Sequence, residues 1–113
     1  YLLGYYTRFG DEGSDIEPLR NLYKTQVYEL ARSLGIPDKI MSKPPTAGLW
    51  QGQTDEGEFG FTYSQADDII LRYIDKKQTL DEIIAAGFEK SLVEKVIKRM
   101  KDNEFKHHLP ILP

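Results

Sequence analysis

The chain has 113 residues, of which 40% are hydrophobic and 29% charged, and its formal net charge at pH 7 is −3. This length and composition are typical of one soluble domain or part of one, and the pI of about 5.4 disfavours a nucleic-acid binder, which usually has a basic face. The sequence has no cysteine, which excludes disulfides and thiolate metal sites, and no apolar run approaches the roughly 20 residues that span a bilayer. We expect a cytoplasmic protein that binds neither nucleic acid nor membrane.

The first six residues, YLLGYY, form an apolar and aromatic run that favours a buried strand over Tyr1–Tyr6. Natural chains start with Met and usually have a frayed polar end, so this start indicates a fragment. One strand is not a fold, and a fragment of an α/β protein is expected. Thr7–Asp15 is glycine-rich and acidic and predicts a loop. Its acidic turn lacks the spacing of a calcium loop, so we interpret it as solvated.

The next segment predicts a helix over about Tyr23–Leu34. Gly35 stands where a glycine ends a helix, and Pro37 blocks continuation. A short helical turn is expected over Asp38–Ser42. The apolar positions of the first helix repeat at helical spacing: Val27, Leu30, Ala31 and Leu34.

A long loop, Lys43–Gly60, is expected to separate the helices. Loops longer than about 12–15 residues without structure of their own are usually functional or disordered. Pro44-Pro45 stiffens its entry and four glycines loosen the rest, which suits a lid that closes over a ligand. The alternative is an exposed crossover loop with Trp50 packed on the surface, and the sequence leaves both open.

Three helices are expected after the loop. The first begins at Ser64 as N-cap, with Asp67 favouring the positive helix end, and runs to about Ile74. The second covers Leu80–Ala86 and the third about Lys90–Asn103. The apolar residues expected to lie on their buried faces are Ala66, Ile70, Tyr73, Ile74, Leu92, Val93, Val96, Ile97 and Met100.

The end of the chain raises two further points. The tail from Phe105 is too rich in proline to predict a helix, and the adjacent His107 and His108 do not naturally face one metal ion. Thr79–Met100 could also form a helix-turn-helix DNA-binding module, although Glu89 and Glu94 and the acidic total favour a solvated helical face.

Lys24 stands near the start of its predicted helix, which is the unfavourable end for a cation. A solvated lysine is the simpler interpretation. The functional one is that Lys24 and the free N–H groups of the helix start attract a phosphate, because conflicts between local rules are expected at functional sites.

Three runs of the sequence together resemble the C-terminal half of ammonia-dependent NAD synthetase. They are GYYTRFGDEGSDIEPLRNLYKTQVYELARSLGIP, KPPTAGLWQGQTDEGEFGFTYSQADDI and NEFKHHLP. The resemblance covers nearly all of the chain. It implies that residues 1–113 are the C-terminal, mostly helical part of an α/β, adenine nucleotide alpha-hydrolase-like (Rossmann-like) parallel-sheet fold, that 43–60 is the active-site lid, and that the full protein is a homodimer.

The resemblance implies a ligase reaction with ATP and Mg²⁺. ATP adenylates the carboxylate of deamido-NAD, and ammonia attacks the acyl-adenylate to give NAD, AMP and pyrophosphate. Such a reaction needs charge neutralisation and the exclusion of water more than side-chain acids or bases. No residue of this chain is expected to act as a catalytic acid, base or nucleophile.

Residue by residue, the resemblance implies two sets of ligands. Lys24 and Thr46 match ATP-binding positions. Asp15 matches a position that binds deamido-NAD, Arg8 stands where many members have a substrate-binding lysine, and Lys106 is retained from a His-Lys pair that contacts the dinucleotide. Arg and Lys are not interchangeable in geometry.

The resemblance places the phosphate-loop motif and the metal ligands upstream of Tyr1, so the fragment alone is expected to be inactive and to hold no metal. The nearest rival is the synthetase domain of a glutamine-dependent NAD synthetase. Another is a truncated, non-catalytic partner that only dimerises.

Overall fold

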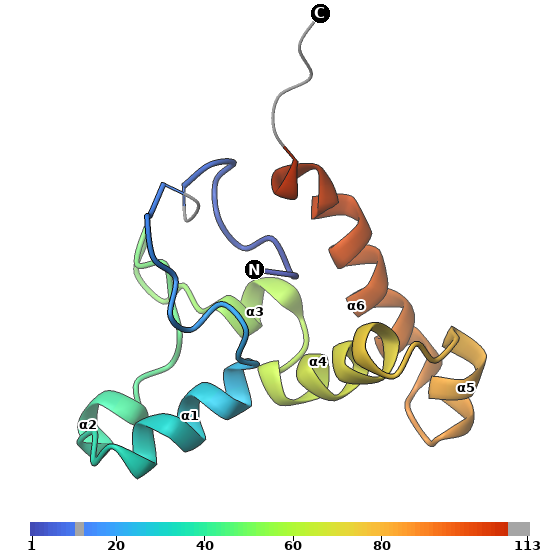
Figure 1. The fold of residues 1–113 in the computed structure, drawn as a ribbon, viewed down its shortest axis with the longest axis horizontal. Helices are drawn as coiled ribbons and strands as arrows, with labels where there is room; N and C mark the ends of the chain where they lie inside the picture. The colour runs from blue at the N-terminus through green and yellow to red at the C-terminus, as the bar shows by residue number, and fades with distance from the viewer. Residues whose placement is uncertain (11–12, 109–113) are drawn as a thin grey trace, which may run out of the picture.

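The computed structural model describes residues 1–10 and 13–108, and these residues form helices and turns without a strand (Figure 1). Parts of the expected loop Thr7–Asp15 and of the expected tail lie outside the described residues. The elements in chain order are α1 (Lys24–Ser33), α2 (Asp38–Met41), α3 (Asp55–Phe59), α4 (Tyr63–Ile70), the π-turn η1 (Leu71–Asp75), α5 (Leu80–Ala85), α6 (Lys90–Asn103) and the 3-10 turn η2 (Glu104–His107).

The core lies where α4, α5 and α6 meet. α4 packs against both α1 and α6, and α5 packs against α6, so α4 is the central element in Figure 1. The largest fully buried side chains come from these helices: Ile69, Ile83, Val93 and Val96. The apolar face predicted for Lys90–Asn103 is confirmed, with the bounds as expected.

The C-terminus of α1 follows the prediction. Gly35 has φ +70°, which a residue with a side chain rarely adopts. Ile36 N donates to Ala31 O at 3.0 Å and Gly35 N donates to Arg32 O at 3.1 Å. This paired arrangement is a Schellman motif, and it satisfies two carbonyls that the helix end leaves free.

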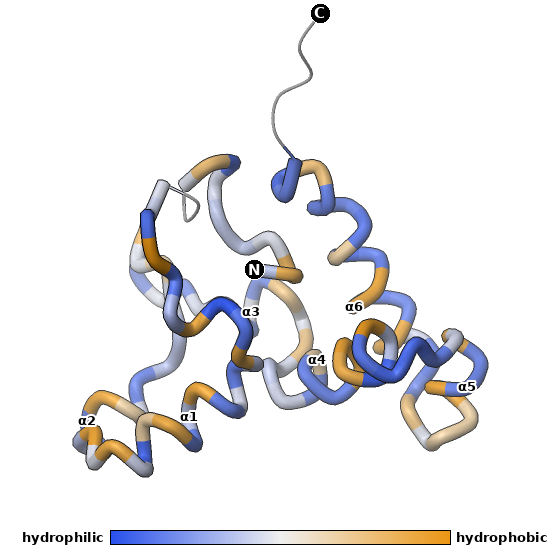
Figure 2. Tube along the Cα trace, in the orientation of Figure 1, coloured by the Kyte–Doolittle hydropathy of each residue, from blue (hydrophilic) through white to orange (hydrophobic). Residues whose placement is uncertain are grey.

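The apolar stripe of α1 is covered only in part by the described segments: Val27 and Ala31 are half-buried, and the other two residues are exposed. Leu30 is 38% exposed and Leu34 69% exposed, and Figure 2 shows hydrophobic stretches along α1 and α2. Ile36 and Ile40 extend this surface. The spacing predicts the helix correctly, but the residues that would bury its apolar side are not among those described.

The strand expected over Tyr1–Tyr6 is wrong. Gly4 has φ +59°, and its N–H donates to Tyr1 O at 2.8 Å in a turn. A strand requires a neighbour to pair its backbone groups, and no described segment supplies one. The carbonyls of Gly4 and Tyr6 instead accept from the Lys106 ammonium at 2.6 and 2.8 Å.

The start of α4 differs from the prediction. Thr62, not Ser64, is the N-cap, because Thr62 Oγ1 accepts from Gln65 N at 3.2 Å while Gln65 Oε1 accepts from Thr62 N at 2.9 Å. This reciprocal pair is a capping box. Asp67 lies beyond the first turn and does not serve the start of its own helix.

Three further details differ from the prediction. The helix continues through the π-turn to Asp75, close to the predicted end at Ile74, but Ile74 is 40% exposed instead of buried. The long loop ends in α3, capped by Thr54 and closed by Gly60 at φ 69°. Phe105 lies in the 3-10 turn η2, because no proline interrupts Glu104–His107.

Thr79 begins α5 with a second capping box, which supports the predicted start of this helix. Glu82 Oε2 accepts from Thr79 N at 2.7 Å, and this backbone hydrogen bond lowers the pKa of Glu82. Thr79→Ala should lower the free energy of unfolding by about 1 kcal/mol, measured by urea unfolding, whereas Thr79→Ser should retain it. A Thr79→Ala protein as stable as the Thr79→Ser protein would contradict this prediction.

Candidate nucleotide site

Lys24 and Thr46, 22 positions apart in the sequence, line one hollow of about 310 Å³. Lys24 comes from the first position of α1 and Thr46 from the long loop. Lys43 lines the same hollow and adds a second ammonium. Lys43 was not predicted as a site residue, although a cation next to two rigid prolines was a readable signal in the sequence. Both predicted ATP-binding residues therefore line one space, which is mostly apolar and whose two charged residues are both lysines.

Aromatic rings flank the Lys24 ammonium. Its Nζ lies 5.8 Å from the ring centroid of Tyr28 and 5.4 Å from that of Tyr63. A ring face attracts a cation at such distances. The two rings therefore direct the ammonium without consuming a hydrogen-bond donor, which leaves its N–H groups available to an anion.

The N–H groups at the start of α1 are not all free to bind an anion, in contrast to the functional interpretation of the sequence. Asp67 is 7% exposed and reaches from α4, where its Oδ2 accepts from Thr25 N at 2.7 Å. A carboxylate already occupies this positive helix end. A phosphate in the hollow would therefore meet the lysine ammonium groups and not the N–H of Thr25.

The long loop is closed at its base. Asp55 N donates to Pro45 O at 3.0 Å, which brings the two ends of Thr46–Thr54 together. Gly48 N donates to the Thr46 hydroxyl at 3.1 Å. That hydroxyl still has its own hydrogen to donate. Trp50 is 56% exposed at the outer part of the loop.

The three residues expected to bind deamido-NAD do not lie in the lysine–threonine hollow. Arg8 lies 5.0 Å from the Phe9 ring centroid and 5.7 Å from that of Phe105, and Lys106 lies 6.0 Å from Phe105. The structure thus brings Arg8 and Lys106, which are far apart in the sequence, close to the same ring, that of Phe105. Asp15 is exposed.

Lys106 is engaged in the fold. Two of its three N–H donors go to the carbonyls of Gly4 and Tyr6. Burial, followed by the positive charge of Arg99, lowers the pKa of Lys106. Lys106 therefore connects the first segment of the chain, by hydrogen bonds, to the 3-10 turn that follows α6.

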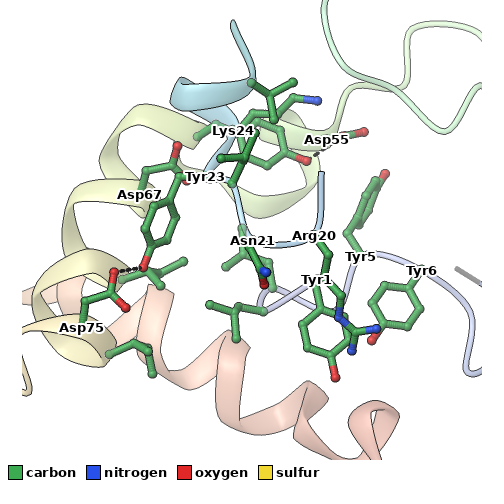
Figure 3. A pocket seen from close by; sticks show the side chains of 17 residues that line it. Tyr1, Tyr5, Tyr6, Arg20, Asn21, Tyr23, Lys24, Asp55, Asp67 and Asp75 are labelled. Atoms are coloured by element: carbon green, nitrogen blue, oxygen red, sulfur yellow. Dashed lines mark hydrogen bonds between the residues drawn. The ribbon is translucent and has the colours of Figure 1, made fainter. Parts of the chain in front are cut away.

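Lys24 also lines a larger cavity of about 610 Å³, between the first segment, α1 and α4 (Figure 3). Two tyrosines in its wall donate to carboxylates: Tyr23 to Asp75 at 2.8 Å and Tyr63 to Asp55 at 2.7 Å. Burial, and then the bond to Asp55, raises the pKa of Tyr63. The two phenols act as hydrogen-bond donors at neutral pH.

Tyr23 gives a test of this wall by its pH dependence. Burial, and then the bond to Asp75, raises its pKa from 10.0 to about 12. Since the unfolded chain loses this proton first, the contribution of Tyr23 to stability is complete below pH 10 and is lost as the pH rises to about 12. The absorbance titration of the protein minus that of Tyr23→Phe should have a midpoint near 12, and Asp75→Asn should lower it. A midpoint at 10 would exclude the contact.

The DNA-binding alternative finds no support. Along α6, the candidate recognition helix, Lys90 Nζ lies 3.7 Å from Glu94 Oε1 and Lys98 Nζ lies 2.6 Å from Asp102 Oδ2. These lysines therefore face acids of their own helix, as a solvated face does.

Within residues 1–10 and 13–108, no three His, Asp or Glu side chains gather in a way that could hold a metal ion. Within the same residues, no helix has the length and apolarity to cross a membrane.

The chain is similar to proteins of one family. A sequence model described as NAD synthase matches residues 1–110. The NH(3)-dependent NAD(+) synthetase of Fusobacterium nucleatum is 43% identical over 97% of this chain and 43% of its own length. That of Pyrococcus horikoshii is 48% identical over 100% of this chain and 44% of its own length.

A solved structure described as NMN synthetase from Francisella tularensis has a TM-score of 0.74 and 40% identity, covering 99% of this chain and 42% of that chain. The described helices thus match the C-terminal helical part of the NAD synthetase fold. The chain belongs to the NAD synthase family. It spans less than half the length of these relatives.

Proposed function

We propose that the protein containing this chain is a ligase that amidates deamido-NAD with ammonia at the expense of ATP. The observation that carries the proposal is the meeting of Lys24 and Thr46 in one hollow. The triphosphate of ATP needs its negative charge neutralised as it reacts. Fixed cations supply this stabilisation in a site shielded from water.

In the proposed reaction, a carboxylate oxygen of deamido-NAD attacks the α-phosphorus of ATP and pyrophosphate leaves. Ammonia then attacks the acyl carbon, AMP leaves with the carboxylate oxygen, and the extra proton passes to solvent. Lys24 holds the phosphates by charge and Thr46 by its hydroxyl. The lid, residues 43–60, covers the acyl-adenylate so that water does not hydrolyse it.

Arg8, Asp15 and Lys106 are proposed to bind deamido-NAD. Arg8 and Lys106 lie around Phe105, and both charges suit the diphosphate of a dinucleotide. Lys106 has one N–H left after its bonds to Gly4 and Tyr6. None of the three residues lines the lysine–threonine hollow.

We also propose that ATP binds as its Mg²⁺ complex. The described residues do not fit a metal site, because they contain no cluster of three ligands, so no step is derived through the metal. A cytoplasmic homodimer is proposed for the whole protein. The exposed apolar surface of α1 and α2, formed by Leu30, Leu34, Ile36 and Ile40, supports burial against another surface.

The test is an assay of the whole protein with deamido-NAD and MgATP, with NAD measured by coupled reduction to NADH. NAD formation with ammonium is expected. NAD formation with glutamine alone would instead support the glutamine-dependent rival, and no NAD with either donor would contradict the proposal. Because one solved relative is described as an NMN synthetase, nicotinic acid mononucleotide is included, and a preference for it would overturn the dinucleotide assignment.

A further inference from the structure

Gln53 is a buried amide inside the lid. It is 7% exposed, in a loop that connects α2 to α3 (Figure 1). A buried polar group costs free energy unless it is hydrogen-bonded. Gln53 meets this requirement with partners from three different parts of the chain.

Each end of the Gln53 side chain has a defined partner. Its Oε1 accepts from Leu49 N at 2.7 Å. Its Nε2 donates to Tyr5 OH at 3.0 Å and to Glu58 Oε1 at 2.7 Å. The amide therefore connects the outer part of the lid to the first segment of the chain and to α3.

The backbone of the lid depends on the same residue. Gln53 N donates to Trp50 O at 3.3 Å, and Asp55 N to Pro45 O at 3.0 Å. Thr46 thus lies between two fixed points, the closed base at Pro45 and the Leu49 N–H held by Gln53. Without the Gln53 side-chain bonds, the outer part of the lid would lose its hydrogen bonds to the first segment and to α3.

We infer that Gln53 is a positioning residue that holds the lid, and with it Thr46, in the arrangement that binds the ATP phosphates. This inference rests on the proposed function for its effect on ATP. A pre-ordered loop binds with less loss of conformational freedom than one that must order on binding. The amide itself touches no substrate.

The deciding variant is Gln53→Glu in the whole protein. A carboxylate has nearly the same shape and keeps an acceptor for Leu49 N, but it does not donate and it repels Glu58. The exchange Gln53→Glu with Glu58→Gln restores one donor and one acceptor at the Glu58 contact, and Tyr5 OH then donates to the new carboxylate. Gln65→Glu is the matched control, because glutamate serves the capping box of α4 as well as glutamine does.

Two readouts separate this inference from the proposed function. Trp50, the single tryptophan, reports on the lid by its fluorescence anisotropy and by acrylamide quenching, which need no catalysis. Gln53→Glu should lower the anisotropy and increase the quenching. It should also raise KM for ATP by about tenfold, the equivalent of one lost buried hydrogen bond. The double variant should recover both values, and Gln65→Glu should match the wild type.

Gln53→Glu with wild-type fluorescence would overturn the inference, since Gln53 would then not hold the lid. A loosened lid with unchanged KM for ATP in an active enzyme would overturn it too. The lid position that Gln53 holds would then have no effect on ATP binding. If the wild type does not amidate deamido-NAD, the proposed function fails. The fluorescence of the variants then still decides whether Gln53 holds the lid.

Discussion

Lys24→Ala should lower kcat/KM for ATP by about 10²–10³-fold in the whole protein, the loss typical of removing one electrostatic group from a reacting centre. Lys24 lines the hollow that Thr46 also lines, and its ammonium lies near the rings of Tyr28 and Tyr63. Lys24→Arg keeps the charge but changes its shape, so an intermediate loss is expected. Steady-state kinetics with varied ATP measure both.

The control for this prediction is Lys90→Ala, which removes an exposed lysine whose Nζ lies 3.7 Å from Glu94 on α6. Its kinetics should match those of the wild type. A Lys24→Ala protein with wild-type kcat/KM for ATP would remove Lys24 from the nucleotide site.

Ile69→Ala should lower the free energy of unfolding by about 2–5 kcal/mol. Ile69 is fully buried in α4, in the core that this helix forms with α5 and α6. Truncation removes apolar contacts and leaves a cavity that the surrounding helices fill only in part. Urea unfolding followed by circular dichroism measures the change.

Ile16→Ala is the matched control, because Ile16 is 78% exposed. Surface substitutions of this kind change stability by about 0.5 kcal/mol or less. If the two variants were equally stable, the core would not lie at the junction of α4, α5 and α6.

The helices with strong local signals could be predicted from the sequence. α6 has four buried apolar residues at helical spacing: Val93, Val96, Ile97 and Met100. α1 is followed by Gly35, whose positive φ is a left-handed conformation that favours glycine. In both cases the deciding interactions lie within a few residues of each other, so a local pattern contains them.

The wrong predictions depended on contacts between distant residues or on weaker local signals. YLLGYY looks like a strand, yet its conformation depends on Lys106, about 100 positions away. Thr62 and Gln65 did carry a readable capping box, but Ser64 offered a competing N-cap. α3 has a capping threonine and acids in its first turn, signals that its glycine-rich surroundings obscured.

The candidate site shows the same division. No periodicity connects Lys24 with Thr46, and their pairing came from the family resemblance, while the shared hollow came from the structure. The bond from Thr25 to Asp67 joins two helices 42 positions apart, so the sequence suggested a free helix end where a carboxylate lies. The burial of Gln53 and its three hydrogen-bond partners could not be predicted from the sequence, where Gln53 is one polar residue of a loop.

The most direct test of the proposed reaction uses deamido-NAD labelled with ¹⁸O in its nicotinate carboxylate. The whole protein is incubated with this substrate, MgATP and ammonium, and the AMP is analysed by mass spectrometry. An acyl-adenylate transfers one carboxylate oxygen to phosphorus, so the AMP should contain one ¹⁸O and the pyrophosphate none. Unlabelled AMP from a reaction that consumes ATP and forms NAD would contradict the account, since the carboxylate would not have attacked the α-phosphorus.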